Sequence, residues 1–339
     1  MLRRVNIRAS RSSQLRISVA MATYQGAAFL NEQLESIAKQ TRLPDELIIS
    51  DDDSADETVK IARKFAEKSP FSVRILQNDE TLGFSRNFEQ ALAAASGNVV
   101  FVSDQDDIWC PEKIERVVAA FERNPDIFSV IHDQRILNQR SGKVFKRTYF
   151  DNQRALGLAE KELVSGNFTA MRRELLSILQ PFPPQLAYDF WIARVSAALG
   201  CRKLIREPLQ LYRRHPSNLS EPVLAHRRPT LIAELFRIGR QDPRLHWRET
   251  LEQWRLVESR VRERSDAIDD CLGKDRTSAA LARLSREIRS LERRIGIMSL
   301  PPIRRRIEVF RNWRGGLYDQ FSGSKSAIRD LLQPLPRHR

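Results

Sequence analysis

Asp104 and Asp106 are the residues whose type and spacing point most directly to chemistry. They stand in the segment SDQDDIW, residues 103–109, at the end of the apolar run 99–103. Two aspartates spaced in this way at a strand end can direct both carboxylates toward one cation. Oxygen ligands suit hard divalent ions such as Mg²⁺ or Mn²⁺, which prefer sites shared with phosphate oxygens. The competing interpretation is an acidic turn that caps a helix beginning near Pro111, and the buried-type strand before the aspartates favours the metal site.

A second acidic cluster, IISDDDSADET, occupies residues 48–58. Here the Asp52 carboxylate can accept a hydrogen bond from a base N–H or a ribose hydroxyl, which orients a nucleotide without a metal. Ser54 is a candidate N-cap for the helix that follows, with Asp56 and Glu57 in its first turn. Neither cluster is rich in glycine, and the chain has no GxGxxG or GxxxxGK segment, which argues against a dinucleotide or P-loop site.

The elements that must position these carboxylates alternate along the first hundred residues. Apolar, strand-like runs alternate with stretches of helical periodicity: strands are expected at 17–21, 46–50, 73–77 and 99–103, and helices at 29–40, 56–68 and 84–96. Repeated strand–helix–strand order predicts an α/β fold with a parallel sheet covered on both faces. Ligands of such sheets bind beyond the carboxyl ends of the strands, where both acidic clusters lie.

Five ordered segments carry a resemblance to a known family. They read SVAMATYQGAAFLNEQLESIAKQT, ISDDDSADET, NDETLGFSRNFEQALAAASGNVVFVSDQDDIW, SGNFTAMRRELL and YDFW. Together they resemble the family-2, inverting glycosyltransferases of the GT-A fold, in particular bacterial rhamnosyltransferase-like members that build surface polysaccharides. The likeness covers residues 17–220. It implies a GT-A fold, with a mostly parallel central sheet flanked by helices, and leaves a C-terminal α-helical extension beyond it.

The resemblance also implies roles for individual residues. The donor nucleotide would contact residues of the first strand ends and the acidic turn: Thr23, Tyr24, Asp52 and Asp104. A divalent cation, Mg²⁺ or Mn²⁺, would bind Asp106 directly, with Asp104 as the second aspartate of the pair. The donor sugar and the acceptor would meet near Gly166, Asn167 and Trp191. Asp189 would be the general base that deprotonates the acceptor hydroxyl.

Asp189 lies between Tyr188 and Phe190, an aromatic setting that can raise the pKa of a carboxylate toward a useful value. The alternative is that Asp189 caps a helix that begins near Phe190, and the two roles are compatible. Arg214 and His215 follow another apolar stretch, where they could bind the diphosphate or form a solvated basic turn.

Two positions depart from the family pattern. Asp53 stands where glycine is usual, and aspartate tolerates a positive φ better than most residues. Tyr188 stands where the subgroup often has histidine, which weakens the assignment of acceptor contacts more than that of the base.

The chain has 339 residues with 57 Lys or Arg against 43 Asp or Glu, and most of the positive excess lies near its end. Residues 276–339 hold fifteen Lys or Arg against five Asp or Glu. We expect a basic leader at 1–16, a catalytic domain at 17–222, and a basic extension at 223–339 with two amphipathic helices that turn near 271–273. The extension could dock on an anionic membrane, form a homo-oligomer, or pack on the catalytic domain. Nucleic acid is not an expected partner, because no nucleic-acid-binding module is present.

The sequence therefore predicts an inverting glycosyltransferase that moves a sugar from a nucleotide-diphosphate donor to a glycan or lipid-linked acceptor in polysaccharide biosynthesis. By resemblance, dTDP-rhamnose is the leading donor. Alternatives are a sugar nucleotidyltransferase, which needs a glycine-rich, arginine-containing loop where this chain reads ATYQGAAF, and a non-catalytic nucleotide-binding scaffold. Cys110, Cys201 and Cys271 lack paired spacing, which fits a reducing compartment. We expect a cytoplasmic protein, with the inner membrane face as one docking site.

Overall fold

The computed structural model describes residues 15–155, 163–164, 166–216, 218, 242–321 and 323–333. The expected basic leader at 1–16 falls almost entirely outside these residues, and so does the expected domain boundary at 222/223. The elements of the catalytic region and those of the C-terminal extension are both described.

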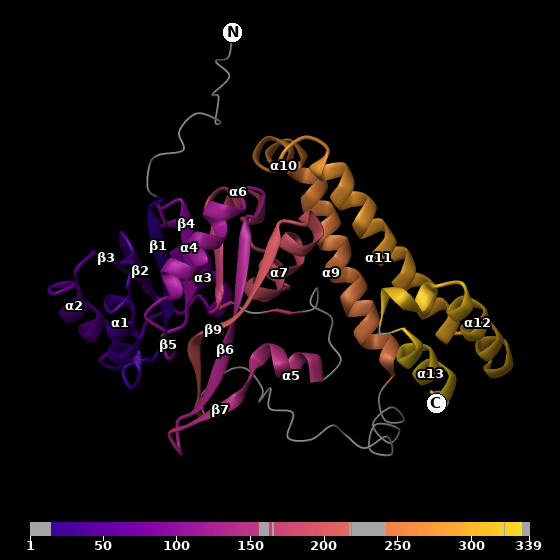
Figure 1. Ribbon diagram of the computed structural model, residues 1–339, viewed down its shortest axis with the longest axis horizontal. Helices are drawn as coiled ribbons and strands as arrows, with labels where there is room; N and C mark the ends of the chain where they lie inside the picture. The colour runs from indigo at the N-terminus through magenta and orange to yellow at the C-terminus, as the bar shows by residue number, and fades with distance from the viewer. Residues whose placement is uncertain are drawn as a thin grey trace, which may run out of the picture.

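A nine-stranded sheet forms the centre of the molecule, and helices cover its faces (Figure 1). The strands are β1 (Ile17–Thr23), β2 (Glu46–Asp51), β3 (Ser72–Gln77), β4 (Val99–Ser103), β5 (Ile108–Trp109), β6 (Ser129–Asn138), β7 (Lys143–Thr148), β8 (Thr169–Arg172) and β9 (Arg202–Arg214). Their order across the sheet is β3-β2-β1-β4-β8-β6-β9-β5, with β7 paired to β6.

The first four strands are parallel to one another, as the alternating pattern predicts. Every residue of β1, β2 and β4 is buried, because helices cover both faces of a parallel sheet. The later strands make the sheet mixed: β8 is antiparallel to β4 and β6, whereas β9 is parallel to β6. The α/β fold is confirmed, and the parallel order applies to its N-terminal half.

The helices of this region are α1 (Leu30–Ala38), α2 (Thr58–Ala66), α3 (Phe84–Ala93), α4 (Lys113–Arg123), α5 (Tyr149–Ala155), α6 (Glu174–Leu179) and α7 (Tyr188–Leu199). Ser54 is not the N-cap of α2, which begins after Glu57. Its hydroxyl instead donates to Asp51 Oδ2 at 2.8 Å, while Asp56 Oδ1 accepts from the Thr58 N–H at 3.0 Å. The loop between β2 and α2 is therefore longer than expected, and its serine stabilises the strand end.

The C-terminal extension is helical, with α9 (Pro243–Glu263), α10 (Ser265–Leu272), α11 (Arg276–Met298), α12 (Pro302–Arg314), the short 3-10 helix η2 (Leu317–Gln320) and α13 (Ser324–Leu332). The chain turns at Gly273, and α11 runs back along α9 (Figure 1). Leu284, Ile288 and Leu291 of α11 are buried in one hydrophobic cluster with residues of β4, α6 and α7. The stripe that could have supported a homo-oligomer is therefore covered within the chain.

Several arginines of the extension bind the carbonyl ends of helices in the catalytic region. Arg283 donates to the Ala198 carbonyl and Arg276 to the Leu199 carbonyl, both at the C-terminus of α7. Arg260 donates to the Ile178 carbonyl in α6 at 3.1 Å. Unpaired carbonyls at a helix C-terminus attract cations, so part of the basic charge holds the extension in place. Among the described residues, no helix combines the length and the apolar character that crossing a bilayer requires.

Candidate active site

The polar side chains meet where β1, β2 and β4 end. Thr23, the last residue of β1, donates from Oγ1 to Asp51 Oδ2 at 2.6 Å and is buried. Its side chain therefore joins the ends of β1 and β2. Tyr24, the next residue, has an exposed side chain, so it is available at the entrance of the site.

Gln105, which lies between the two aspartates of the pair, fastens the acidic turn to the loop after β1. Its Oε1 accepts from the Tyr24 N–H at 2.9 Å and its Nε2 donates to the Tyr24 carbonyl at 2.8 Å. A Cβ added at Gly26 would lie 2.0 Å from Gln105 Oε1, so any larger residue here would displace the Gln105 amide. Neither residue was predicted from the sequence to belong to the site.

Asp52 uses its carboxylate to hold the loop before α3. Oδ1 accepts from Asn78 Nδ2 at 3.0 Å and from the Leu82 N–H at 2.8 Å, and Oδ2 accepts from the Gly83 N–H at 2.9 Å. The predicted contact with a base would therefore be made by a carboxylate that already shapes the loop. Asp53 has φ of 61°, so the turn survives with aspartate in place of glycine, as expected.

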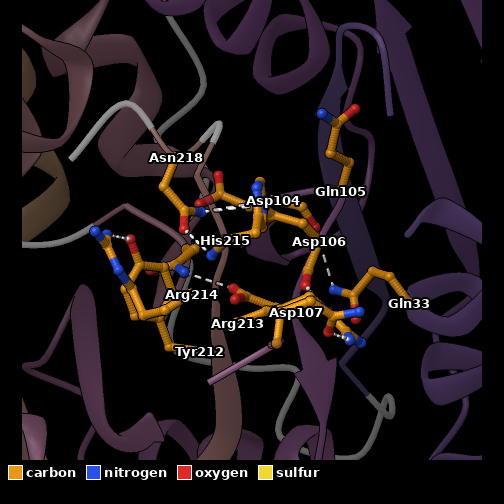
Figure 2. Close-up of polar contacts among 12 residues, drawn as sticks. Gln33, Asp104, Gln105, Asp106, Asp107, Tyr212, Arg213, Arg214, His215 and Asn218 are labelled. Atoms are coloured by element: carbon orange, nitrogen blue, oxygen red, sulfur yellow. Dashed lines mark hydrogen bonds and ion pairs between the residues drawn. The ribbon is translucent and has the colours of Figure 1, made fainter. Parts of the chain in front are cut away.

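Asp106 is the centre of the acidic turn, where three side chains from the end of β9 and the residues after it converge (Figure 2). His215 Nε2 lies 2.8 Å from Asp106 Oδ2, and Asn218 Nδ2 donates to the same oxygen at 3.2 Å. The imidazole stacks on Phe29 with the ring centroids 4.4 Å apart. Arg213 Nε donates to the Asp106 carbonyl at 2.8 Å. Asp106, the predicted metal ligand, and the basic segment are thus one structural unit.

Arg213, and not Arg214, is the arginine that enters this unit. Its guanidinium is buried and also pairs with Glu32 at 2.5 Å and with Gln139 at 2.5 Å. Arg214 lies against Tyr212, with Nη1 3.1 Å from the tyrosine hydroxyl. Both arginines belong to β9, where successive side chains point to opposite faces. Arg214 is therefore less favourably placed than Arg213 for the predicted contact with a diphosphate.

Asp106 and His215 suit a divalent cation as a pair of ligands. One carboxylate oxygen and one imidazole nitrogen 2.8 Å apart can face the same ion, and carboxylate with imidazole is a donor set that Mn²⁺ accepts. Within the described ranges no cluster of three or more His, Cys, Asp or Glu side chains has metal-binding geometry. Two protein ligands are the expected number where diphosphate oxygens and water complete the coordination.

Asp104 lies beside this pair in a strongly negative environment. Burial raises the pKa of its carboxyl well above the usual range, and the charges of Asp107, Asp106 and Asp189 add to the rise. The carboxylate of Asp104 accepts no hydrogen bond from the residues that the structure describes, whereas its carbonyl accepts from Ser103 Oγ at 3.0 Å and from Gln33 Nε2 at 3.3 Å. A carboxylate under such repulsion is relieved by a cation or by hydroxyl donors.

A buried network that the sequence analysis missed lies beneath the acidic turn. Asp107 Oδ2 accepts from Asn167 Nδ2 at 2.5 Å and from Gln210 Nε2 at 3.0 Å, and Lys113 Nζ donates to Gln210 Oε1 at 2.6 Å. Burial raises the pKa of Asp107 to about 8, and the charge of Asp106 adds to the rise. Asn167, which was expected to face the sugars, is thus directed into this network. The acidic run DQDD offered a signal for Asp107, but its partners come from distant segments of the chain.

Asp189 lies in the first turn of α7, close enough for its charge to raise the pKa of Asp104. Burial raises the pKa of Asp189 itself, against the hydrogen bond that it accepts from the Phe190 N–H at 2.8 Å. The helix begins at Tyr188 with Ala187 as the N-cap, so Asp189 does not cap it. Tyr188 is buried and stacks on Phe88, with its hydroxyl against Gly166. The loop at Gly166 therefore contacts Tyr188, the residue next to Asp189.

Trp191 does not reach the site, so its predicted contact with the sugars is wrong. Its side chain is buried, and the indole Nε1 donates to the Leu179 carbonyl at 2.8 Å. The guanidinium of Arg260 lies over its ring, 5.1 Å from the centroid. Residues two apart on a helix are separated by about 200° around the axis, so Trp191 points away from the direction of Asp189.

Comparison with known proteins agrees with this geometry. Residues 18–179 match the sequence model described as Glycosyl transferase family 2. These residues form a family-2 glycosyltransferase domain. An uncharacterized glycosyltransferase of Nostoc, alr2836, is 30% identical over 216 residues, which are 60% of this chain and 66% of that protein. The dTDP-rhamnosyl transferase RfbG of Shigella flexneri is 34% identical over 102 residues, 29% of this chain and 35% of that protein. The chain thus spans just under two-thirds of the former and about a third of the latter.

Solved structures support the GT-A fold over nearly the whole chain. The S. aureus TarS fragment 1–349 in complex with UDP has a TM-score of 0.52 at 16% identity and matches 94% of this chain and 89% of its own. The mannosyltransferase PcManGT of Pyrobaculum calidifontis, in complex with GDP-Man and Mn²⁺, has a TM-score of 0.50 at 20% identity, covering 94% and 88%. The GT-A fold expected from the sequence is confirmed.

Proposed function

We propose that this protein is an inverting, metal-dependent glycosyltransferase that uses a nucleotide-diphosphate sugar. The observation that carries the proposal is the approach of Asp189 to Asp104, because it brings a base candidate from α7 to the acidic turn after β4. Family membership of residues 18–179 supports the same reaction class. A sugar nucleotidyltransferase has less support, because the loop after β1 lacks its glycine-rich, arginine-containing sequence.

In the proposed reaction, Asp189 takes the proton of the acceptor hydroxyl as its oxygen attacks the anomeric carbon of the donor. The bond from that carbon to the diphosphate oxygen breaks, and the nucleoside diphosphate leaves from the opposite face. General-base assistance of this kind contributes roughly 10²–10⁴ in rate. No covalent enzyme intermediate is needed, so the sugar inverts at the anomeric carbon.

The leaving-group side of the site is formed by Asp106 and His215. A divalent cation, Mg²⁺ or Mn²⁺, bound between them would neutralise negative charge on the departing diphosphate. Arg213 holds the Asp106 backbone, and Gln105 holds the turn against the loop after β1. Thr23, Tyr24 and Asp52 define where the nucleotide would lie, at the ends of β1 and β2. These residues orient the donor, and Asp189 acts on the acceptor.

We propose dTDP-rhamnose as the first donor to test and a glycan or lipid-linked hydroxyl in surface polysaccharide synthesis as the acceptor class. The rhamnosyl transferase of Shigella flexneri named above supports this choice of donor. We also propose a cytoplasmic site of action, because the three cysteines are free thiols.

The decisive experiment screens nucleotide sugars for donor hydrolysis and transfer, with Mn²⁺ and with a chelator. We expect activity with at least one donor, its loss on chelation, and its loss in Asp106→Ala. Activity that persists through both treatments would remove the metal assignment. Donor binding without turnover across a broad acceptor panel would favour the scaffold alternative.

A further inference from the structure

Helix α12 carries an apolar stripe that nothing in the described chain covers. Ile303, Ile307 and Phe310 are 76%, 54% and 51% exposed. Steps of four and three residues place these side chains on one face of the helix. The opposite face holds the buried residues of α12, which pack toward α11, η2 and α13: Arg305, Val309 and Asn312. One face of α12 is thus packed against the rest of the protein, and the apolar stripe on the other face is exposed to solvent.

Arginines border the stripe on both sides. At about 100° per residue, Arg304 and Arg311 lie on one side of the stripe and Arg306 on the other, and all three are exposed. Arg314, also exposed, continues the line of the stripe at the end of the helix. The acidic residue of α12, Glu308, pairs with Arg311 at 2.9 Å. An apolar stripe between rows of long cationic side chains is the pattern of helices that lie in a membrane interface.

The neighbouring helix adds to the same surface chemistry. On α13, Ile328 and Leu332 are exposed one turn apart, next to the exposed Lys325. Among the described residues, five of the twelve exposed large apolar side chains belong to α12 and α13. These helices lie at the end of the molecule opposite α2 and β3 along its longest axis (Figure 1). Contact with a flat surface there leaves the N-terminal half of the sheet unobstructed.

We propose that α12 docks this protein on an anionic lipid bilayer. The stripe of Ile303, Ile307 and Phe310 would enter the boundary between headgroups and acyl chains, and the flanking arginines would contact lipid phosphates. Charge complementarity selects this occupant, because residues 276–339 carry fifteen Lys or Arg against five Asp or Glu. A second copy of α12 fits less well, since a twofold contact would bring two arginine-rich rims together.

The surface assigned to membrane contact is smaller than the whole basic extension. The hydrophobic stripe of α11 is buried against the catalytic region, and Arg276 and Arg283 bind helix carbonyls. The surface left for a bilayer is therefore α12 with its neighbour α13. It acts independently of the transfer chemistry, since none of its residues lies in the site around Asp106 and Asp189.

The test is co-sedimentation of the full chain with vesicles of phosphatidylcholine alone and of phosphatidylcholine with phosphatidylglycerol. We expect strong pelleting with the anionic vesicles, weakened as salt rises. The variant Ile303→Ser/Ile307→Ser/Phe310→Ser should lower the partition coefficient about tenfold or more. Its matched control, Leu43→Ser/Val144→Ser/Leu245→Ser, changes three other exposed apolar residues and should pellet like the unchanged protein.

A second pair of variants distinguishes the effect of the charge on α12 from the effect of the overall charge of the protein. Arg304→Glu/Arg306→Glu on α12 should abolish the preference for anionic vesicles, whereas Arg286→Glu/Arg289→Glu on α11 makes the same charge change on another exposed surface and should reduce it much less. Equal loss in both pairs, or unchanged pelleting of the triple-serine variant, would overturn the proposal. A change from dimer to monomer in that variant, without a vesicle effect, would assign the stripe to self-association. Transfer to a water-soluble acceptor should be unaffected, so failure here leaves the proposed reaction standing.

Discussion

His215 Nε2 lies 2.8 Å from Asp106 Oδ2, although 109 residues separate the two in sequence. The contact joins the end of β9 to the turn after β4, and the stacking of His215 on Phe29 fixes the orientation of the imidazole. Asn218 adds a third polar group at the same carboxylate oxygen. A cation that binds Asp106 would therefore also draw in the segment after β9, which couples metal binding to the position of that segment.

The first prediction concerns this pair. His215→Ala should raise the Mn²⁺ concentration needed for half-maximal activity by about 10–100-fold, because the ion loses a ligand and Asp106 loses its partner. Mn²⁺ binding followed by electron paramagnetic resonance, with UDP, GDP or dTDP present, gives a readout that does not depend on turnover. His246→Ala, on α9, is the matched control and should behave as the unchanged protein. An unaltered Mn²⁺ affinity in His215→Ala would exclude the imidazole as a ligand.

The second prediction tests Asp189 as the base. Asp189→Asn preserves the size of the side chain and removes its ability to take a proton. We expect kcat to fall by roughly 10²–10⁴ while the Kd for the donor, measured by calorimetry, changes little. Asp126→Asn, an exposed carboxylate after α4, should leave both quantities unchanged. A parallel loss of donor affinity in Asp189→Asn would instead indicate a role in binding.

The third prediction is a pH dependence. A base must be deprotonated, so activity rises with pH through the pKa of Asp189. Burial raises that pKa, and therefore the acid limb of kcat/KM should lie above the range of an ordinary aspartate, near 3.9. Weaker metal binding at low pH would also produce an acid limb. That limb would move as the Mn²⁺ concentration changes, whereas a limb that belongs to Asp189 would stay in place.

Much of the N-terminal half of the fold could be predicted because its elements follow local rules. The expected strand at 99–103 coincides with β4, and the expected helix at 84–96 overlaps α3. Runs that are buried on both faces, separated by stretches of helical period, leave few topologies to choose from. The later strands are different, because β8 and β9 join the sheet through long-range pairing that no local pattern specifies.

The errors at the site also have physical causes. The family resemblance placed Trp191 near the sugars, yet the helix that begins at Tyr188 turns it toward Leu179. Arg214 was predicted to contact the diphosphate, but β9 extends as far as Arg214, and strand alternation directs Arg213 to the Asp106 carbonyl. In both cases, a shift of one residue in where the helix begins or where the strand ends decides which side chain faces the site.

The buried network beneath the site shows a different limit. Asp107, Asn167 and Gln210 meet from three distant segments, and each side chain is common in exposed loops. Their burial follows only from the packing of β5, β8 and β9 around them. Apart from the acidic run that contains Asp107, the sequence offered no way to distinguish this set from a solvated turn.

The last prediction concerns Gly166 and Tyr188. A Cβ at residue 166 would lie 1.8 Å from the Tyr188 hydroxyl and 2.4 Å from Cζ, so Gly166→Ala forces the loop and the ring apart. Overpacking of this kind costs about 1–3 kcal/mol in the free energy of unfolding, which urea titration measures. Activity should fall as well, because Asp189 is the residue next to Tyr188. Gly296→Ala, in a helix with open space at that position, is the control and should be neutral or slightly stabilising.

A double-mutant cycle identifies the atom responsible. Tyr188→Phe removes the hydroxyl that is nearest to residue 166 but keeps the ring, so it relieves part of the overlap. The pair Gly166→Ala/Tyr188→Phe should therefore lose less stability than the sum of the single changes, by at least about 0.5 kcal/mol. If the losses of stability were strictly additive, the loop would move without contacting the Tyr188 ring. In that case the contact between Gly166 and Tyr188 would not be what sets the distance from the loop to Asp189.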